Sequence, residues 1–218
     1  METRAKQVVI GVTGASGCAL AWQLILSLLK TGSHVHLVLT PAALLTAGYE
    51  LSKKLTRPKN WIEQLPKKYQ DQIQVYQNAD LGAKIASGSF HVDATLIVPC
   101  SVASLSAIAC GLGDNLLRRV ADVAIKERRP LLLAPREMPF SPIHLENMLK
   151  LARLGVIIAP PVPSWYLDTK DLKAMEEVIV ARLMQLCSLP RPESYRSWTG
   201  ERFERGDLFT EPLSDASR

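Results

Sequence analysis

Two adjacent residues, Arg136 and Glu137, combine a permanent cation with a carboxyl group that can exchange a proton. They follow an apolar run, Leu131–Ala134, which lies between two prolines and is typical of a strand buried on both faces. In an open α/β sheet, ligands bind beyond the carboxyl ends of the strands. The pair is therefore expected at a binding site for an anionic ligand. The alternative is that both side chains only pair with neighbours in a surface loop.

A glycine-rich segment near the N-terminus, GVTGASG, holds Gly11, Gly14 and Gly17 at intervals of three residues. Glycines permit a tight turn and let backbone amides approach a phosphate, and Ser16 adds a hydroxyl donor. The helix predicted to follow, Gly17–Leu29, would add a favourable dipole at its N-terminus. The segment indicates a phosphate-binding loop, and the alternative is a turn that binds no ligand.

Hydroxyl side chains follow two other predicted strands. Thr40 follows His34–Leu39, while Ser101 and Ser104 follow Thr95–Val98. A dinucleotide-binding fold would favour an acidic residue after the second strand, whereas a small hydroxyl suits a mononucleotide phosphate or a flavin. These hydroxyls can equally serve as helix N-caps, and the two roles are compatible.

Three basic side chains fall on predicted helices. Arg119 and Lys126 are seven residues apart on the helix Leu116–Arg128, so they share one face, and Asp122 between them can pair with both. They form either a surface ladder of ion pairs or a face directed at the same anion as Arg136.

The closing helix, Asp171–Cys187, carries the third of these cations. Its inward stripe is predicted to contain Leu172, Met175, Ile179, Leu183 and Leu186. Arg182 lies at the edge of that stripe and needs an acidic partner or a ligand phosphate. The phenol of Tyr166, in the proline-rich loop before this helix, can hydrogen-bond a ligand or simply be half-buried.

Alternation of strands and helices sets the expected fold class. The six predicted strands are Gln7–Val12, His34–Leu39, Ile73–Val75, Thr95–Val98, Leu131–Ala134 and Val156–Ile158. This order predicts an α/β protein with one three-layer α/β/α domain around a parallel, Rossmann- or flavodoxin-like sheet. The domain is expected to span residues 1–187. Residues 188–218 are expected to form a polar C-terminal arm, with Trp198 as its one large apolar anchor.

Composition limits the class of function. The chain has 218 residues, 47% of them hydrophobic, so it is expected to be globular. Its net charge of +5 is not gathered in runs and only 6% of residues are aromatic, which argues against nucleic-acid binding. Residues 52–72, rich in Lys and Gln, are predicted to form a solvated, partly helical excursion.

The cysteines and the apolar segments suggest a compartment. Four cysteines without a CxxC pair or a histidine cluster predict no metal site and a reducing environment. No apolar segment is long enough for a signal peptide or a membrane span, so a cytoplasmic protein is expected.

From about Val8 to Leu186, the chain resembles the UbiX-like flavin prenyltransferases, which are flavodoxin-like flavoproteins. The most specific segment is ADVAIKERRPLLLAPREMPFSPIHLENMLKLARLG, from Ala121 to Gly155. The segments GVTGASG, ASGS and PCS, together with Tyr166 and Arg182, fall in the family's order.

The resemblance implies a reaction and an assembly. The dimethylallyl group of dimethylallyl phosphate is joined to N5 and C6 of reduced FMN, and prenylated FMN passes to a UbiD-like decarboxylase. It also implies that no metal is required and that the protein is a homododecamer with sites at subunit contacts.

The resemblance also implies roles for individual residues. The FMN would be lined by Gly14, Ala15, Ser16, Thr40, Ser101, Val102, Ala103, Ser104 and Arg136. The dimethylallyl phosphate would be held by Tyr166, Arg182, Lys126 and Ser87, with Arg136 and Glu137 also at its phosphate. The residues nearest the chemistry would be Glu137, Lys126, Glu50 and Arg119.

Two other functions are compatible with parts of the sequence. A short-chain NAD(P)-dependent reductase also opens with TGASG and needs a Tyr-x-x-x-Lys pair, a spacing found at Tyr166 with Lys170 and at Tyr49 with Lys53. A non-catalytic FMN-binding partner of a decarboxylase would need only the flavin contacts. The phosphate-binding set of Glu137, Lys126, Tyr166 and Arg182 favours the prenyltransferase over both.

Overall fold

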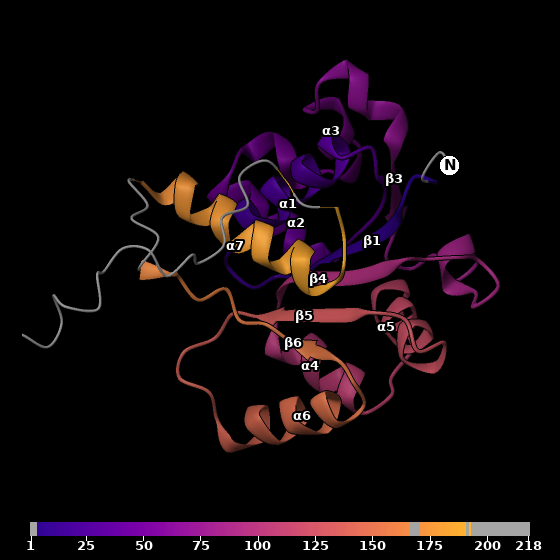
Figure 1. Ribbon diagram of the computed structural model, residues 1–218, viewed down its shortest axis with the longest axis vertical. Coiled ribbons are helices and arrows are strands. Elements are labelled where there is room, and N and C mark those ends of the chain that lie inside the picture. Colours follow the sequence, from indigo (N-terminus) through magenta and orange to yellow (C-terminus); the bar gives the residue numbers. More distant parts are fainter. Residues whose placement is uncertain (1–3, 166–170, 191, 193–218) are drawn as a thin grey trace, which may run out of the picture.

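The computed structural model describes residues 4–165, 171–190 and 192 (Figure 1). Its six strands are β1 (Gln7–Val12), β2 (His34–Leu39), β3 (Ile73–Gln77), β4 (Ala94–Cys100), β5 (Leu131–Pro135) and β6 (Ile157–Ile158). Its α-helices are α1 (Cys18–Lys30), α2 (Pro41–Glu50), α3 (Pro58–Glu63), α4 (Val102–Ala109), α5 (Leu116–Lys126), α6 (Pro142–Arg153) and α7 (Leu172–Leu186). Short 3₁₀ helices are η1 (Lys53–Thr56), η2 (Lys67–Gln72) and η3 (Lys84–Ala86).

All six strands are parallel and form one sheet in the order β3-β2-β1-β4-β5-β6. The chain builds outward from β1 to β3 on one side and then crosses to β4 on the other. β1 and β4 are therefore adjacent strands whose following segments diverge, which is the topological switch point of an open sheet.

Two hydrophobic clusters cover the two faces of the sheet. One joins the β1 residues Val8, Ile10 and Val12 to buried side chains of α1, α2 and α7. The other joins Val9 of β1 to buried side chains of α4, α5 and α6. Figure 1 shows these helices above and below the sheet. The predicted three-layer α/β/α fold is confirmed, because alternate strand residues enter opposite cores.

The closing helix α7 shows where one prediction of burial is wrong. Leu172 was predicted inward, but it is the first residue of α7 and is 73% exposed. The buried side chains of α7 are Val180, Ala181, Leu183 and Met184. These lie in its second half because α7 packs against α1 there. Packing continues beyond the helix, since Leu189 is 5% exposed within the same core.

The described part of the chain has no helix that is both long and apolar enough to cross a membrane. Three of its cysteines, Cys18, Cys100 and Cys187, are buried as free thiols, and Cys110 is exposed. Small buried thiols behave as ordinary core residues.

A buried polar cluster surrounds His36, which is 3% exposed on β2. Its Nε2 donates to Gln7 Oε1 at 2.9 Å, and Tyr76 Oη, 3.0 Å away, then donates to Nδ1. Burial, assisted by the charges of Lys84 and His34, lowers the pKa of His36 from 6.5 to about 4. His36 is therefore neutral in the folded protein near pH 7.

We expect the free energy of unfolding to decrease as the pH falls from 6.5 toward 4. The folded pKa of His36 is below its unfolded value, so the unfolded chain binds the additional proton in this range. Between about pH 7.5 and about pH 5, His36 should lower the free energy of unfolding by about 2 kcal/mol. Urea unfolding at both pH values measures this loss, and His36→Gln should remove that part of it. An identical pH dependence in both proteins would contradict the assignment.

Candidate functional site

The carboxyl ends of β1 and β4 lie side by side at the switch point and carry most of the predicted flavin contacts. β1 leads into the loop 13–17, and β4 leads into Ser101, the N-cap of α4. β2 ends next to β1 at Thr40, and β5 ends next to β4 at Arg136. The structure therefore brings the loops after four strands to one edge of the sheet, where ligands of open α/β folds bind.

Thr13 links the two central strands and is 1% exposed. Its hydroxyl donates to the carbonyl oxygen of Pro99 at 2.8 Å and accepts from the backbone N–H of Ser101 at 2.7 Å. Both groups belong to the end of β4, while Thr13 directly follows β1. This single hydroxyl therefore fixes Ser101 relative to the glycine-rich loop.

The hydroxyls of Ser101 and Ser104 have different partners. Ser101 Oγ accepts from the N–H of Ser104 at 3.2 Å and donates to Ser104 Oγ at 3.1 Å. Ser101 is thus the predicted N-cap, and its proton is already used. Within the described residues, Ser104 Oγ only accepts, so its own proton is available to a ligand. Val102 and Ala103 lie between them in the first turn of α4, and Ala103 is exposed.

The loop 13–17 is held closely against α2. A side chain at Gly14 would place its Cβ 2.5 Å from the Cβ of Ala42, so only glycine fits there. Gly17 has φ 114°, which also favours glycine. Ala15 is buried, whereas Gly14 and Ser16 are exposed at the edge of the crevice. These features support the predicted close approach of backbone to a ligand.

Glu50 occupies the N-terminus of α1, where the sequence analysis placed a helix dipole facing a phosphate. Its carboxylate accepts from the N–H of Gly17 at 3.0 and 3.1 Å and from the N–H of Cys18 at 2.7 Å. Because Gly17 has no side chain, α1 is capped by Glu50 from the end of α2. These two amides are therefore already bonded to Glu50 in this chain. The exposed amides and hydroxyls of residues 14–16 remain for an anion.

Thr40 is the N-cap of α2, and its hydroxyl accepts from the N–H of Ala43 at 3.1 Å. The alternative raised for this residue is therefore confirmed as a structural role. The hydroxyl proton is not used by that bond. Thr40 lies directly beyond β2, so it can serve the ligand as well.

Arg136 and Glu137 follow β5 and are both exposed. Within the described residues neither side chain forms an ion pair, so the surface-pair alternative is not observed. Arg136 Nε donates to the carbonyl oxygen of Ser16 at 3.2 Å. The backbone N–H of Arg136 donates to the carbonyl oxygen of Cys100, also at 3.2 Å. The guanidinium therefore reaches from the end of β5 across to the glycine-rich loop.

The two thiols beside this edge are not nucleophiles at neutral pH. Burial, reinforced by the Glu50 carboxylate, raises the pKa of Cys18 to about 12. Burial alone raises the pKa of Cys100 to about 12 as well. The chemistry of the crevice therefore depends on its hydroxyls, amides, guanidinium and carboxylates.

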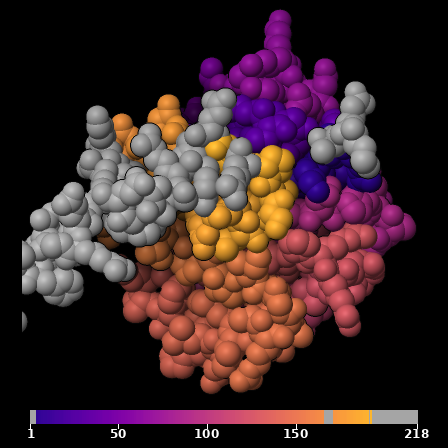
Figure 2. All heavy atoms as spheres, in the orientation of Figure 1, coloured from indigo at the N-terminus to yellow at the C-terminus, as the bar shows by residue number. Residues whose placement is uncertain are grey.

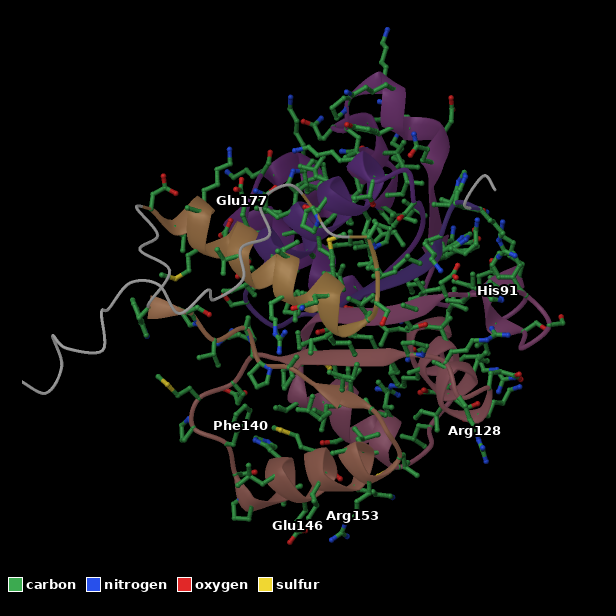
Figure 3. All side chains as sticks on the ribbon, in the orientation of Figure 1. His91, Arg128, Phe140, Glu146, Arg153 and Glu177 are labelled. Atoms are coloured by element: carbon green, nitrogen blue, oxygen red, sulfur yellow. The ribbon has the colours of Figure 1, made fainter. Side chains whose placement is uncertain are left out.

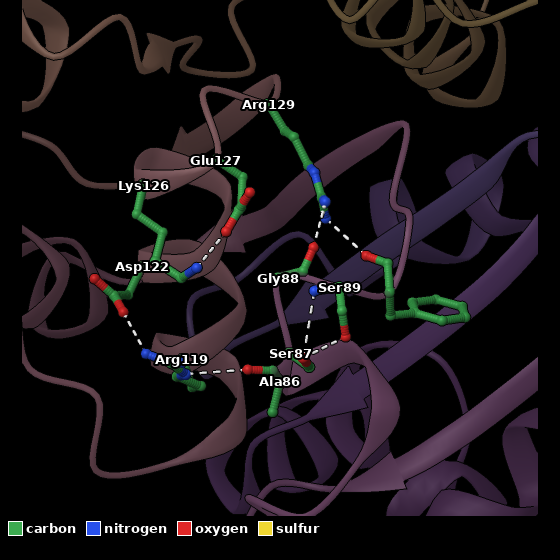
Figure 4. A network of polar contacts seen from close by, with 10 residues as sticks. Ala86, Ser87, Gly88, Ser89, Arg119, Asp122, Lys126, Glu127 and Arg129 are labelled. Carbon is green, nitrogen blue, oxygen red and sulfur yellow. Dashed lines mark hydrogen bonds and ion pairs between the residues drawn. The ribbon is translucent and has the colours of Figure 1, made fainter.

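A second cluster lies along α5 (Figure 4). Arg119 Nε donates to the carbonyl oxygen of Ala86 at 3.1 Å, and its guanidinium pairs with Asp122 at 2.7 Å. Lys126 pairs with Glu127, so the prediction that Asp122 pairs with both cations is correct for Arg119 only.

Ser87 belongs to the segment that packs against this cluster. Its hydroxyl lies 2.8 Å from that of Ser89, and both residues are exposed. Arg129 donates to the carbonyl oxygens of Gly88 at 2.6 Å and Phe90 at 2.8 Å, which holds the segment in place. Lys126 and Ser87 therefore belong to one surface (Figure 4).

This surface is not continuous with the crevice. α5 runs antiparallel to β5, so Lys126 precedes the strand whereas Arg136 follows it. The intervening strand has five residues, which separates the two ends by roughly 15 Å. Within the described residues, Arg119 bonds to Ala86 and Asp122 and forms no hydrogen bond with Arg136. The prediction that Lys126 faces the same anion as Arg136 is therefore wrong within one chain, whereas Arg119, near the start of α5, is not separated from Arg136 by this argument.

Arg182 is also remote from Arg136. It is exposed on α7, and its guanidinium donates to Gln185 Oε1 at 2.6 Å instead of to an acid. Leu186 and Cys187, one turn later, line a hollow of about 470 Å³ with Arg129 and Leu131 at the amino end of β5. Arg182 thus lies toward the same end of the sheet as Lys126. Tyr166 and Trp198 lie outside the described residues.

The donors at this edge of the sheet fit an FMN. Exposed backbone at Gly14 and Ser16, the free hydroxyl proton of Ser104 and the guanidinium of Arg136 provide donors for a phosphate and for ring carbonyl oxygens. In the part of the chain that the structure describes, no group of three His, Cys, Asp or Glu side chains could hold a metal ion.

Two contributions to this site were missed by reasoning from the sequence. Thr13 was assigned no role, although a hydroxyl residue within a buried strand end is an available signal. The cap formed by Glu50 depends on residues 33 positions apart and has no local pattern. The reductase pair Tyr49 and Lys53 is not on one helix, because α2 ends at Glu50 and Tyr49 is 84% exposed.

Comparison with known proteins identifies the family. The flavoprotein family model matches residues 1–184. The flavin prenyltransferase UbiX of Chlamydia trachomatis is 44% identical over 187 residues, which cover 86% of this chain and 95% of the relative. The mitochondrial flavin prenyltransferase PAD1 of Saccharomyces cerevisiae is 41% identical, over 90% of this chain and 77% of the relative.

Two solved structures support the same assignment. One is AnUbiX (PadA1) in complex with FMN and dimethylallyl pyrophosphate, with a TM-score of 0.80 and 34% identity over 90% of this chain and 99% of that one. The other is a dodecameric FMN-dependent UbiX-like decarboxylase from Escherichia coli O157:H7, with a TM-score of 0.77 and 35% identity over 89% of this chain and 100% of that one. The chain therefore belongs to the flavoprotein family and, within it, to the UbiX-like flavin prenyltransferases.

Proposed function

We propose that the protein transfers the dimethylallyl group of dimethylallyl phosphate to N5 and C6 of reduced FMN and so produces prenylated FMN. The observation that carries this proposal is the position of Arg136, whose guanidinium contacts Ser16 beside the flavin crevice. A fixed cation at this place can hold a phosphate next to the ring. The named relatives, all flavin prenyltransferases, support the same reaction.

The residues of the crevice would bind and orient the flavin. Backbone groups of residues 14–16 and the hydroxyl of Thr40 would hold its phosphate, and Ser104 would donate to a ring carbonyl oxygen. Thr13 would keep Ser101 and the start of α4 in register with the loop. Reduced FMN supplies the nucleophilic ring atoms once it is bound.

The basic and acidic groups would act on the departing phosphate. Loss of phosphate from an allylic carbon leaves negative charge on the oxygens, and preorganised cations lower that barrier. Arg136 would stabilise this charge with charge-assisted hydrogen bonds of about 1.5–3 kcal/mol each. The exposed Glu137, next to it, would give a proton to the phosphate and later take one back.

The remaining cations would come from another chain. Lys126, Ser87 and Arg182 lie away from the flavin contacts of their own chain, yet the family resemblance assigns them to the dimethylallyl phosphate. The dodecameric relative from Escherichia coli offers an assembly in which such surfaces meet. We therefore infer that each complete site joins the flavin contacts of one chain to the surface of another chain that carries Lys126 and Ser87. Tyr166 and Arg182 would belong to the same phosphate site.

The product would leave the protein as a cofactor for a UbiD-like decarboxylase. This transfer is part of the proposal because the enzyme ends its reaction with a modified flavin and no decarboxylation step of its own. Some solved relatives are named decarboxylases, and the experiment below separates the two activities.

Incubation with reduced FMN and dimethylallyl phosphate tests the reaction directly. We expect mass spectrometry to show a flavin heavier by one prenyl group, and phosphate release in equal amount. Oxidised FMN serves as the control, because it lacks the nucleophilic ring. Bound but unmodified FMN would indicate a carrier, and carbon dioxide release from an acrylic acid without added prenyl donor would indicate a decarboxylase.

A further inference from the structure

The excess positive charge of the chain is concentrated in the excursion formed by residues 52–72, here called the basic platform. It contains two carboxylates, Glu63 and Asp71, and six cations: Lys53, Lys54, Arg57, Lys59, Lys67 and Lys68. The platform therefore carries four of the chain's five net positive charges. The rest of the molecule is close to neutral.

The basic platform is a folded structure. It consists of η1, α3 and η2, which lie above α1 and beside β3 (Figure 1). Trp61 is fully buried at its base, donates from Nε1 to the carbonyl oxygen of Leu55 at 3.0 Å, and packs edge-on against Trp22 of α1. Leu55 and Leu65 are buried in the same core. This apolar base fixes the positions of the charged side chains.

The outer surface of the basic platform is polar and cationic. All six cations are exposed, and the platform forms the outermost part of the molecule at the top of Figure 2. Within the described residues, none of them forms an ion pair. Holding six like charges together on a rigid base costs electrostatic free energy, which a negatively charged partner would relieve.

We propose that the basic platform is a docking surface for an acidic protein. A symmetric contact with a second copy would place lysine against lysine, and this repulsion argues against self-association through this face. A carboxylate-rich surface would be complementary and would also accelerate encounter by electrostatic steering. The proposal does not depend on the reaction that the enzyme performs.

Two other polyanions fit the platform less well. Binding of single-stranded nucleic acid relies on exposed aromatic rings, but Trp61 is buried and the Tyr69 ring is covered by the Lys68 ammonium at 4.8 Å. Binding to a membrane surface usually adds apolar side chains that enter the interface. The described large hydrophobic side chains that are exposed include none from residues 52–72.

A charge-reversal experiment tests the proposal. The probe is fluorescent poly-L-glutamate, and its affinity for the full-length protein is measured by anisotropy over a range of salt concentrations. The platform variant combines Lys53→Glu, Lys54→Glu, Lys67→Glu and Lys68→Glu. We expect it to bind at least about tenfold more weakly than the wild type, because opposite charges become like charges. Its thermal midpoint and prenyltransferase activity should be unchanged.

A matched control has the same change of net charge elsewhere. It combines Arg128→Glu, Lys150→Glu, Arg153→Glu and Lys173→Glu, which are exposed residues outside the basic platform. Figure 3 shows Arg128 and Arg153 pointing away from the molecule. The control variant should keep most of the wild-type affinity for poly-L-glutamate. An equal loss in both variants, or no binding by the wild type, would refute a localised docking surface.

The class of partner is tested with two further probes. These are a single-stranded DNA of about 20 nucleotides and vesicles of phosphatidylcholine with phosphatidylglycerol. Weaker binding to both than to poly-glutamate, at equal salt, supports an acidic protein. Tighter platform-dependent binding to either one would overturn that identification.

Discussion

Co-expression of Lys126→Ala and Arg136→Ala chains is expected to restore activity that neither variant has alone. Lys126 and Arg136 lie at opposite ends of β5, so one chain cannot direct both at one phosphate. Each variant by itself should lose at least about a hundredfold in turnover, since each removes a cation that stabilises the leaving phosphate. In equally mixed oligomers, about a quarter of two-chain sites contain both native residues. The measurement is prenylated FMN formed per flavin site.

A matched pair distinguishes shared sites from a general effect of mixing. Arg136→Ala and Glu137→Ala alter adjacent residues after β5, so both belong to the same half of a site. Co-expression of these two variants should restore nothing. Recovery in this second pair, or no recovery in the first, would contradict assembly of the site from two chains.

Replacement of Thr13 by valine is expected to weaken FMN binding by roughly tenfold to a hundredfold. Valine preserves the shape but leaves the part-buried Ser101 N–H without its partner and leaves the Pro99 carbonyl with only the backbone N–H of Thr13, at 3.3 Å. An unsatisfied buried donor costs about 1–3 kcal/mol, and the relief of that cost would move Ser101 and the start of α4 away from the end of β1. Quenching of flavin fluorescence gives the dissociation constant directly.

Thr13→Ser is the control, because it retains the hydroxyl and removes only a methyl group. It should bind FMN nearly as tightly as the wild type. A general loss of stability would lower the thermal midpoint of the Val variant without changing the affinity of its folded fraction. Unchanged affinity in Thr13→Val would show that this hydroxyl does not position the flavin site.

The fold was predictable because its signals are local. Runs such as Leu131–Ala134 are apolar throughout, as parallel strands buried on both faces must be, and the strand is observed there. Thr40 and Ser101 were recognisable as N-caps because each precedes a helical pattern. These elements together specify the order of the sheet.

The site was predictable only in part because its contacts join distant residues. Glu50 reaches Gly17 and Cys18 across 33 and 32 positions, and no sequence pattern marks that contact. The separation of Lys126 from Arg136 could have been inferred, since a helix that joins two parallel strands runs antiparallel to them. The family resemblance groups these residues by function, but it does not say that they belong to different regions of one chain.

The attachment of α2 determines how a ligand can enter the crevice. α2 is tied to the glycine-rich segment at both ends and in its middle: Thr40 donates its N–H to Val12, the Thr46 hydroxyl donates to Gly14, and Glu50 accepts from Gly17. Hydrogen bonds at three positions hold α2 against this segment, so we do not expect α2 to move away when a ligand binds. We therefore expect the flavin and the prenyl donor to enter from the other side, between the start of α4 and the segment after β5.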